Sequence, residues 1–385
     1  MIDNICLFET PAYKKLLPLV HYRPVYDLKC GLITIREKAE LHYPGIPFSF
    51  YCREYLTDIV KQKNPGSQVN VIDGTNCLFI NGHIVVDNDF VKQVSLNGDD
   101  AVYITDSTIA AIKLSGKNLE LVKDRSSENF ILSNFAHLPQ INISVKLITY
   151  PWQLVNINGG EIASDFLLLK PQDVKDNIKG TVYDGAMLVN RDDIVILEGS
   201  KIKPGVVLDA EAGPIYIGKN VTILPNAVIE GPACIGNNSI IKAGAKLYEN
   251  SSIGPFCKVG GEIEASIIHS YSNKQHDGFL GHSYLGSWVN LGANTNNSDL
   301  KNNYSTIRMI VDGEEIDTGS MFNGAIIGDH SKTAIGTLLN TGTVIGVSSN
   351  IFGAGFPKKF VPSFIWGGTD KTVEFDLQKS IETAK

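Results

Sequence analysis

The sequence predicts an α/β domain over residues 1–185, a parallel β-helix over residues 186–356, and a short tail over residues 357–385. The β-helix is predicted because aliphatic residues recur at every sixth position, a period that neither an α-helix nor an ordinary strand has. The α/β domain is predicted because short apolar runs are mixed with helical segments and lack that period. A length of 385 residues with 36 glycines suits two turn-rich domains.

Three apolar runs predict buried strands of the first domain: Asn4–Phe8, Cys77–Ile80 and Ala101–Ile104. The segment Pro151–Lys179 is predicted to be helical in pieces. We expect breaks at Gly159-Gly160 and at Pro171, because glycine and proline interrupt helices.

Eight aliphatic residues carry the six-residue period: Ile217, Ile223, Ile229, Ile235, Ile241, Leu247, Ile253 and Val259. A mostly small residue stands four positions after each of them, Ile263 taking that place after Val259. Gly218, Gly236 and Gly254 directly follow an aliphatic residue, where glycine relieves strain in a tight turn. Each period therefore predicts one face of a coil, and the aliphatic side chains stack in columns from about residue 194 to residue 356.

Composition narrows the class of partner and the compartment. The net charge is −7 and no block of Lys or Arg occurs, which argues against nucleic acid or an anionic membrane. No apolar run approaches the roughly 18 residues of a membrane span, and Met1–Asn4 does not begin a signal peptide, so a cytoplasmic protein is expected. The cysteines are scattered and favour buried thiols over disulfides or metal ligands: Cys6, Cys30, Cys52, Cys77, Cys234 and Cys257.

Leu16–Val25 and Gly31–Lys38 resemble the opening of sugar-phosphate nucleotidyltransferases. In that family a glycine-rich loop follows the first strand, and a P-L-T-x-x-R-P-K stretch then helps to position the nucleotide phosphates. Tyr150–Leu154 resembles a motif late in the same domain. The resemblance implies a nucleotidyltransferase-like fold for the first domain.

The first domain also departs from that family. Glu9–Lys15 stands in place of the glycine-rich loop and cannot cradle a triphosphate on backbone N–H groups in the same way. Val25 replaces the family's lysine, and Asn81 stands where the family usually places a Mg²⁺-binding aspartate. Either nucleotide is bound through other groups, such as Arg23 and Lys29, or this chemistry has been lost; Mg²⁺ is expected only if the domain is active.

The regular period fails between Ile263 and Ser331, and natural sequences tend to break local rules at functional sites. This region resembles the left-handed β-helix of the bacterial bifunctional glucosamine-1-phosphate N-acetyltransferase and N-acetylglucosamine-1-phosphate uridylyltransferase. That family has a histidine, two glycines and a V-N-V-G-A-G-T stretch at this spacing. The matching residues here are His276, Gly281, Gly286, Val289–Ala293 and Thr295, and a polar loop, Asn296–Thr318, follows them.

The resemblance implies that His276 is a catalytic base. In N-acetylation a neutral amine attacks the thioester of acetyl-CoA, and an imidazole with an ordinary pKa near ~6.5 can accept the amine proton at neutral pH. The alternative interpretation is that His276 is a hydrogen-bonded surface residue. His282 lies six residues later, in repeat phase, and is a second candidate.

Other candidates are carried over from the family one by one. Lys242 stands where the family has a phosphate-binding arginine, so the charge is kept and the bidentate fork is lost. Lys274 is a candidate for the second phosphate-binding cation. Asn290 matches the family's sugar-binding asparagine, and Asn303 and Tyr304 lie near the next one.

Acetyl-CoA has three candidate contacts. Ala293 matches a position whose backbone lines the acetyl-CoA channel of the family, and Lys358 and Lys359 are candidates for the CoA phosphates. The tail is expected to leave the solenoid at Pro357 and to end in a helix at Glu374–Thr383.

The resemblance implies acetyl-CoA-dependent N-acetylation of an amino-sugar phosphate, with glucosamine-1-phosphate favoured, in nucleotide-sugar synthesis of the UDP-N-acetylglucosamine type. Uridylyl transfer from UTP by the first domain is a weaker second activity. A homotrimer is expected, since acyltransferases of this type build their sites between neighbouring prisms. Two alternatives stay open: a nucleotidyltransferase whose β-helix is only a trimerisation scaffold, and a non-catalytic regulatory protein that binds a UDP-sugar.

Overall fold

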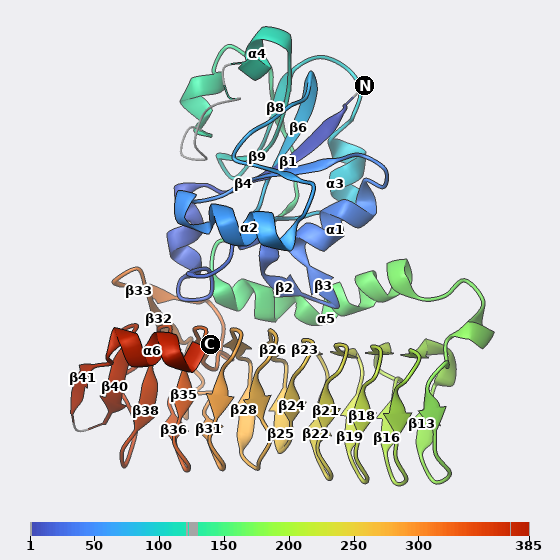
Figure 1. Ribbon diagram of the computed structural model, residues 1–385, viewed down its shortest axis with the longest axis vertical. Coiled ribbons are helices and arrows are strands. Elements are labelled where there is room, and N and C mark those ends of the chain that lie inside the picture. The colour runs from blue at the N-terminus through green and yellow to red at the C-terminus, as the bar shows by residue number, and fades with distance from the viewer. Residues whose placement is uncertain (1, 121, 123–129, 370, 385) are drawn as a thin grey trace. The chain divides into compact units, whose positions relative to one another are not determined.

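The computed structural model describes residues 2–120, 122, 130–369 and 371–384 (Figure 1). Its contacts divide the chain into an N-terminal unit and a β-helix unit. The first comprises Met1–Leu16, Tyr22–Leu28 and Ile33–Thr149, and the second Leu17–His21, Lys29–Leu32 and Tyr150–Lys385. This division differs from the predicted boundary at residue 185, because the chain from Tyr150 onward packs with the β-helix.

The N-terminal unit contains a seven-stranded sheet of order β10 (Gln140–Asn142), β8 (Ala101–Thr105), β9 (Thr108–Ser115), β6 (Asn76–Asn81), β1 (Asn4–Phe8), β4 (Phe48–Tyr51) and β5 (Gln68–Val69). Strand β9 is antiparallel to both of its neighbours, and the other pairs are parallel. The predicted strands at Asn4, Cys77 and Ala101 are confirmed as β1, β6 and β8. The remaining elements of the unit are β3 (Ile33–Thr34), β7 (Ile84–Val85), β11 (Lys146–Leu147), α1 (Ile35–His42), α2 (Thr57–Lys63), α3 (Asn88–Gln93) and α4 (Gly116–Glu120).

A buried histidine in this unit makes its stability depend on pH. His83 is 2% exposed, and its Nδ1 lies 2.7 Å from the carbonyl oxygen of Ile148. Burial lowers the pKa of His83 to about 4. The folded state therefore binds fewer protons than the unfolded state between about pH 4 and pH 6.5, and stability must rise with pH across that window.

We expect acidification from pH 7 to pH 4.5 to remove a stabilisation on the order of 3 kcal/mol that comes from His83. In His83→Gln this contribution should be absent, because an amide can donate to Ile148 without titrating. Urea unfolding followed by circular dichroism at both pH values measures the difference. Equal pH dependence in the two proteins would contradict the prediction.

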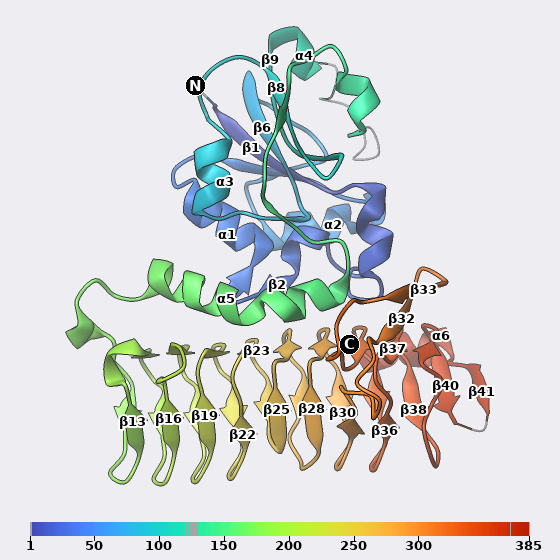
Figure 2. The ribbon, with the colours of Figure 1, turned by 180° about the vertical axis from the view of Figure 1, so that it is seen from behind.

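The β-helix unit is a succession of coils with three faces (Figure 2). The first face has nine strands: β14 (Ile194–Ile196), β17 (Ile215–Ile217), β20 (Ala233–Ile235), β23 (Ser251–Ile253), β26 (Ile267–Ile268), β29 (Tyr284–Leu285), β34 (Ile326–Ile327), β37 (Val344–Ile345) and β39 (Phe360–Val361). Ten coil strands form the second: β12 (Thr181–Val182), β15 (Lys201–Ile202), β18 (Thr222–Ile223), β21 (Ile240–Ile241), β24 (Lys258–Val259), β27 (Asn273–Lys274), β30 (Asn290–Leu291), β35 (Lys332–Thr333), β38 (Asn350–Phe352) and β40 (Ile365–Gly368), with β41 (Thr372–Glu374) antiparallel at its end. The third contains β13 (Met187–Val189), β16 (Val207–Asp209), β19 (Val228–Glu230), β22 (Lys246–Leu247), β25 (Glu262–Glu264) and β28 (Phe279–Gly281), followed by β31 (Asn296–Asn297) and β36 (Leu338–Leu339).

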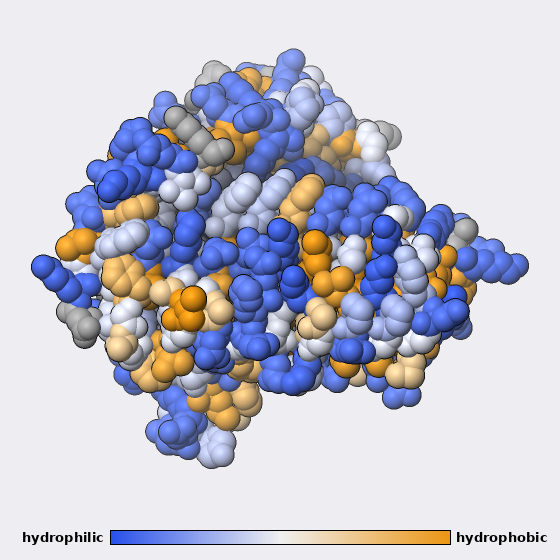
Figure 3. Space-filling model, turned by 60° about the horizontal axis from the view of Figure 1, so that its bottom comes forward, coloured by the Kyte–Doolittle hydropathy of each residue, from blue (hydrophilic) through white to orange (hydrophobic). Residues whose placement is uncertain are grey.

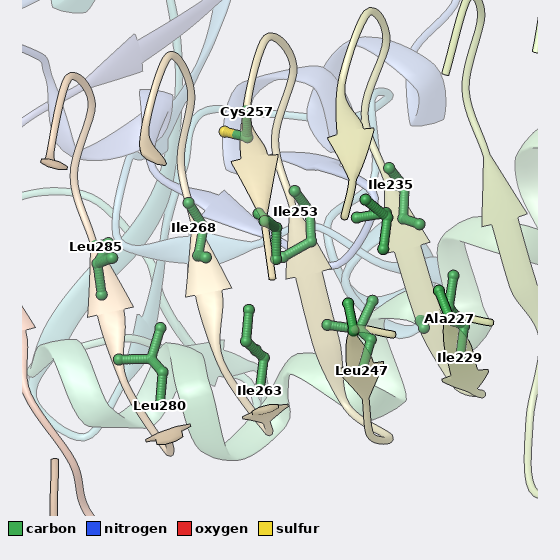
Figure 4. Close-up of a cluster of buried hydrophobic side chains, with 14 of the residues drawn as sticks. Ala227, Ile229, Ile235, Leu247, Ile253, Cys257, Ile263, Ile268, Leu280 and Leu285 are labelled. Carbon is green, nitrogen blue, oxygen red and sulfur yellow. The ribbon is translucent and has the colours of Figure 1, made fainter. Parts of the chain in front are cut away.

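Aliphatic columns fill the interior of the coils, as the six-residue period predicted. Figure 4 shows two of them, the first-face column Ile235, Ile253, Ile268 and Leu285, and the third-face column Ile229, Leu247, Ile263 and Leu280. The expectation that Ile263 occupies a small turn position is wrong, since Ile263 pairs with Leu247 and Leu280 in register. The step from Val259 to Ile263 is shorter than six residues, and it contains Gly261, where φ is +73°.

The coils extend beyond the predicted range on both sides. They begin at β12 and continue through β39 and β40, where Val361 pairs with Ile345 and Gly367 with Ile351. The chain therefore does not leave the solenoid at Pro357, because apolar residues after the Pro357–Lys359 turn return to the columns. The terminal helix is α6 (Leu377–Ala384), slightly later than expected.

Helix α5 (Pro151–Leu169) is continuous, so the predicted break at Gly159-Gly160 is wrong, whereas the helix does end before Pro171. The helix lies along the first face and contacts β20, β23 and β29. A Cβ on Gly159 would lie 1.8 Å from Oδ1 of Asn250, whereas one on Gly160 would meet nothing within 4 Å. Gly159 therefore permits a close approach to the coils, and this packing outweighs the low helix propensity of glycine.

An insertion leaves the coils after β31 and returns at β34. It contains the hairpin β32 (Arg308–Val311) and β33 (Glu314–Asp317), in the region predicted to be a polar loop. Strand β29 pairs directly with β34, so the ladder of the first face continues across the insertion. Asn296 and Asn297, which were assigned to the loop, still belong to the coil as β31.

All six cysteines are free and buried, as expected. Among the described residues, no helix has both the length and the apolar character that crossing a membrane requires. Hydrophilic side chains are spread over the face shown in Figure 3, between smaller groups of hydrophobic ones.

Candidate functional site

A hollow of about 670 Å³ lies at the corner where the second face of the β-helix turns into the third. It is lined by residues from the turns after β18, β21, β27 and β30: Leu224, Lys242, Ala243, Gln275, His276, Asp277, Ala293 and Asn294. We call it the His276 hollow. It brings together three predicted site residues from three coils, Lys242, His276 and Ala293.

A second hollow, of about 370 Å³, adjoins the first and shares Asp277 and Asn294 with it. Its other lining residues are Gly244, Lys246, Gly261, Glu262, Gly278, Phe279 and Asn296. Phe279 contributes an aromatic ring without a hydroxyl group to this lining. Lys246 and Glu262 form an ion pair on its wall.

The turn that carries His276 is fixed by the next coil, while the histidine itself is exposed. The amide of Asn294 donates to the carbonyl oxygen of Asp277 over 2.9 Å. Gly278 adopts φ +117°, and a Cβ there would lie 2.2 Å from the carbonyl oxygen of Thr295. The corner therefore presents an imidazole at the edge of the hollow on a fixed backbone, as proton transfer to a positioned base requires.

Lys274 does not line either hollow. It is 2% exposed, and its Nζ donates to the carbonyl oxygens of Gly260, over 3.1 Å, and of His276, over 2.8 Å. It occupies an inward position of β27 beside Val259, and its role as a phosphate contact stays a prediction.

Three predicted sugar contacts lie away from the lining of the two hollows. Asn290 is half-buried on the second face, between Asn273 and Lys332 of the neighbouring strands. Asn303 and Tyr304 belong to the insertion, where Oδ1 of Asn303 accepts hydrogen bonds from Ser305 and Tyr304 is exposed. The structure therefore does not gather these residues with His276 in the lining of one hollow.

The two lysines predicted to contact CoA also lie outside this lining. Lys358 is exposed in the turn before β39. Lys359 is half-buried, and its pKa is lowered by burial and by the nearby charge of Lys301, against the influence of Glu315. Both residues directly precede β39 and do not line the His276 hollow. Of the predicted site residues, only Lys242, His276 and Ala293 line this hollow together.

The predicted nucleotide contacts are both buried. Arg23 is 4% exposed in the N-terminal unit, and its carbonyl oxygen accepts a hydrogen bond from Arg53 over 2.7 Å. Lys29 is 6% exposed in the β-helix unit, where its amide donates to the Tyr284 hydroxyl over 2.9 Å and its Nζ bonds to the carbonyl oxygen of Leu32. The Lys29 ammonium is therefore engaged with its own loop.

An acidic residue stands where the related nucleotidyltransferases have their glycine-rich loop. Glu9 is fully buried, pairs with Arg53 over 3.1 Å and accepts a hydrogen bond from the amide of Val25 over 2.8 Å. Burial raises the pKa of Glu9, and Arg53 partly offsets that rise. The segment after it is a short 3-10 helix, Pro11–Leu16, so these residues do not form a phosphate cradle.

Asn81 likewise does not fit a magnesium ion. Its Nδ2 donates to the carbonyl oxygen of Ile109 over 2.8 Å, and its Oδ1 accepts from the amide of His83 over 3.0 Å, so both ends of the amide serve the fold. Within the described part of the chain, no three His, Cys, Asp or Glu side chains are grouped so that they could hold a metal ion.

A histidine–aspartate pair lies at the corner between the third and first faces. Nδ1 of His282 is 2.8 Å from Oδ2 of Asp299, and the imidazole stacks on Phe322 with 5.1 Å between ring centroids. Sequence reasoning noted His282 from its repeat phase but missed these partners, because they follow in the irregular insertion. This pair is on a different corner from His276.

Comparison with known families finds a match in the N-terminal part of the chain and another within the β-helix. Residues 5–173 match the model of the sugar nucleotidyl transferase family, and residues 214–249 match six bacterial transferase hexapeptide repeats. The N-terminal segment is therefore similar to sugar nucleotidyl transferases, and part of the β-helix is similar to bacterial transferase hexapeptide repeats. The predicted order of a nucleotidyltransferase-like α/β domain followed by a parallel β-helix of hexapeptide repeats is thereby confirmed.

Curated relatives of this chain carry the names of bifunctional proteins. The bifunctional sugar-1-phosphate nucleotidylyltransferase/acetyltransferase of Sulfurisphaera tokodaii is 27% identical over 87% of this chain and 88% of its own length. The bifunctional protein GlmU of Wigglesworthia glossinidia brevipalpis is 26% identical over 66% of this chain, and the match spans about half, 51%, of that relative. GlmU of Methanococcus vannielii is 33% identical over 36% of each chain.

Proposed function

We propose that this protein transfers the acetyl group of acetyl-CoA to the amino group of a sugar phosphate, with glucosamine-1-phosphate as the favoured acceptor. The observation that carries the proposal is the convergence of Lys242, His276 and Ala293 on the His276 hollow. We further propose a cytoplasmic homotrimer acting in nucleotide-sugar synthesis of the UDP-N-acetylglucosamine type. The name of the relative from Sulfurisphaera tokodaii, a nucleotidylyltransferase/acetyltransferase, supports the acetyl transfer.

The chemistry assigns one role to each of two side chains. The acceptor amine attacks the thioester carbonyl, a C–N bond forms, the C–S bond breaks, and the CoA sulfur leaves and takes up a proton. His276 accepts the proton that the amine loses. Lys242 supplies a positive charge on the same hollow for the sugar phosphate.

Uridylyl transfer is the second candidate activity, favoured by the family match of residues 5–173. Glu9 and Asn81 oppose it, because Glu9 pairs with Arg53 in place of a glycine-rich loop and both ends of the Asn81 amide serve the fold. Mg²⁺-dependent turnover of UTP that survives His276→Ala would establish it. Binding of UDP-sugars without turnover of either kind would favour a regulatory role instead.

The experiment that tests the acetyltransferase proposal is the release of CoA thiol from acetyl-CoA in the presence of glucosamine-1-phosphate. Thiol release that depends on the acceptor supports the proposal. Absence of release with glucosamine-1-phosphate and with other amino-sugar phosphates would overturn it.

A further inference from the structure

Lys274 occupies a position in the interior of the β-helix where the neighbouring coils carry aliphatic side chains. In register, Ile223 pairs with Ile241, Ile241 with Val259, and Val259 with Lys274. These residues form the inward column of the second face, and Lys274 is as buried as they are, with 2% of its surface exposed. Lys274 is therefore a charged residue in line with the aliphatic residues Ile223, Ile241 and Val259.

The ammonium group of Lys274 joins the turns of two successive coils. It donates to the carbonyl oxygen of Gly260 in the preceding coil, over 3.1 Å, and to that of His276 in its own coil, over 2.8 Å. A Cβ on Gly261 would lie 2.7 Å from Nζ, so the ammonium fills the space beneath this corner. The side chain thus contacts the backbone of His276 from inside while the imidazole stands outside.

This arrangement is unfavourable for the stability of the fold. Burial lowers the pKa of Lys274 to about 8, against the opposing influence of Asp277 and Glu262. Removing an ammonium from water is costly unless it is well paired, and an aliphatic side chain would fill the column without that cost. Local rules of this kind are typically broken at functional sites.

We propose that Lys274 is a positioning residue, which fixes the backbone of His276 from within the β-helix and thereby holds the imidazole at the edge of the His276 hollow. The inference rests on the proposed function, since it assigns Lys274 a part in the same reaction. Lys274 does not touch the substrates in this role. It acts only through the carbonyl oxygens that it holds.

The test replaces Lys274 with leucine, the side chain that the column otherwise favours. In Lys274→Leu the melting temperature is expected to stay the same or rise, because no ammonium is buried. The kcat for CoA thiol release with glucosamine-1-phosphate is expected to fall by roughly 10²-fold, the scale of effect of a small misplacement of a catalytic group. The KM for acetyl-CoA should stay near the wild-type value.

Val259→Leu is the matched control, because it changes volume in the same column one coil earlier and leaves the ammonium in place. It should leave kcat near wild type. Unchanged kcat in Lys274→Leu would overturn the proposal, and so would a lower melting temperature in both Lys274→Leu and Lys274→Met, which would show that the lysine serves the fold. A wild-type protein without acetyl transfer would instead refute the proposed function itself.

Discussion

Replacing His276 with alanine is expected to lower kcat for acetyl transfer by at least about 10²-fold, within the range that a positioned general base contributes. The side chain is exposed at a turn and takes no part in the interior columns, so the melting temperature should not change. The measurement is CoA thiol release at saturating acetyl-CoA and glucosamine-1-phosphate, with the variant beside the wild type.

His282→Ala is the control for this result, because it removes an imidazole from another corner of the same coil. His282 is held by Asp299 and Phe322, away from the lining of the His276 hollow. Its loss is expected to leave kcat near the wild-type value. A large loss of activity in His282→Ala together with full activity in His276→Ala would transfer the role of base to His282.

Gly254→Ala is expected to destabilise the β-helix unit by about 3 kcal/mol or more, at the upper end of the cost of overpacking. A Cβ at this position would lie 1.2 Å from the carbonyl oxygen of His269 and 2.4 Å from its carbonyl carbon. Both atoms belong to the backbone of the next coil, which cannot move without breaking the hydrogen bond from the Gly254 amide to Ile268, 2.7 Å long. Thermal unfolding followed by circular dichroism measures the loss.

Gly244→Ala is the control, because it tests the loss of the conformational freedom of glycine without a steric contact such as that of Gly254 with His269. Gly244 has φ +68°, but a Cβ there would meet nothing within 4 Å. Its replacement should cost only the strain of a left-handed backbone, about 1 kcal/mol. Equal losses in the two variants would show that the approach of Gly254 to His269 is not what limits substitution.

The β-helix could be predicted from the sequence because burial dictates the same kind of side chain at every coil. Ile235, Ile253 and Leu285 satisfy that requirement, and the turn glycine Gly254 follows from it. Lys242, His276 and Ala293 were carried over from the family resemblance, and they converge on one corner because each of them follows a second-face strand of its own coil.

The other features of the fold and of the candidate site depend on contacts between residues, which a local sequence pattern does not show. Lys274 was predicted to bind phosphate. The step from Val259 to Ile263 is shorter than six residues, and this shift of phase turns the Lys274 side chain inward. Gly159 looked like a helix breaker, although the approach of Asn250 makes glycine necessary there. The burial of Arg23 and Lys29 likewise comes from packing of segments distant in sequence.

Strand β29 pairs directly with β34, yet the insertion that follows β31 also packs on the coils, because β32 contacts β37 and the side chains of Ile307 and Met309 are buried. Its ends are held together by the coils, and the loop-closure entropy of a longer insertion grows slowly, by about 0.6 kcal/mol for each doubling of length. The exposed tip of the hairpin β32–β33, at Asp312 and Gly313, can therefore be extended with little effect on the thermodynamics of the coils, whereas exchange of the whole hairpin would remove the buried Met309. Evolution can in this way vary the length of the hairpin tip while the solenoid keeps its sequence.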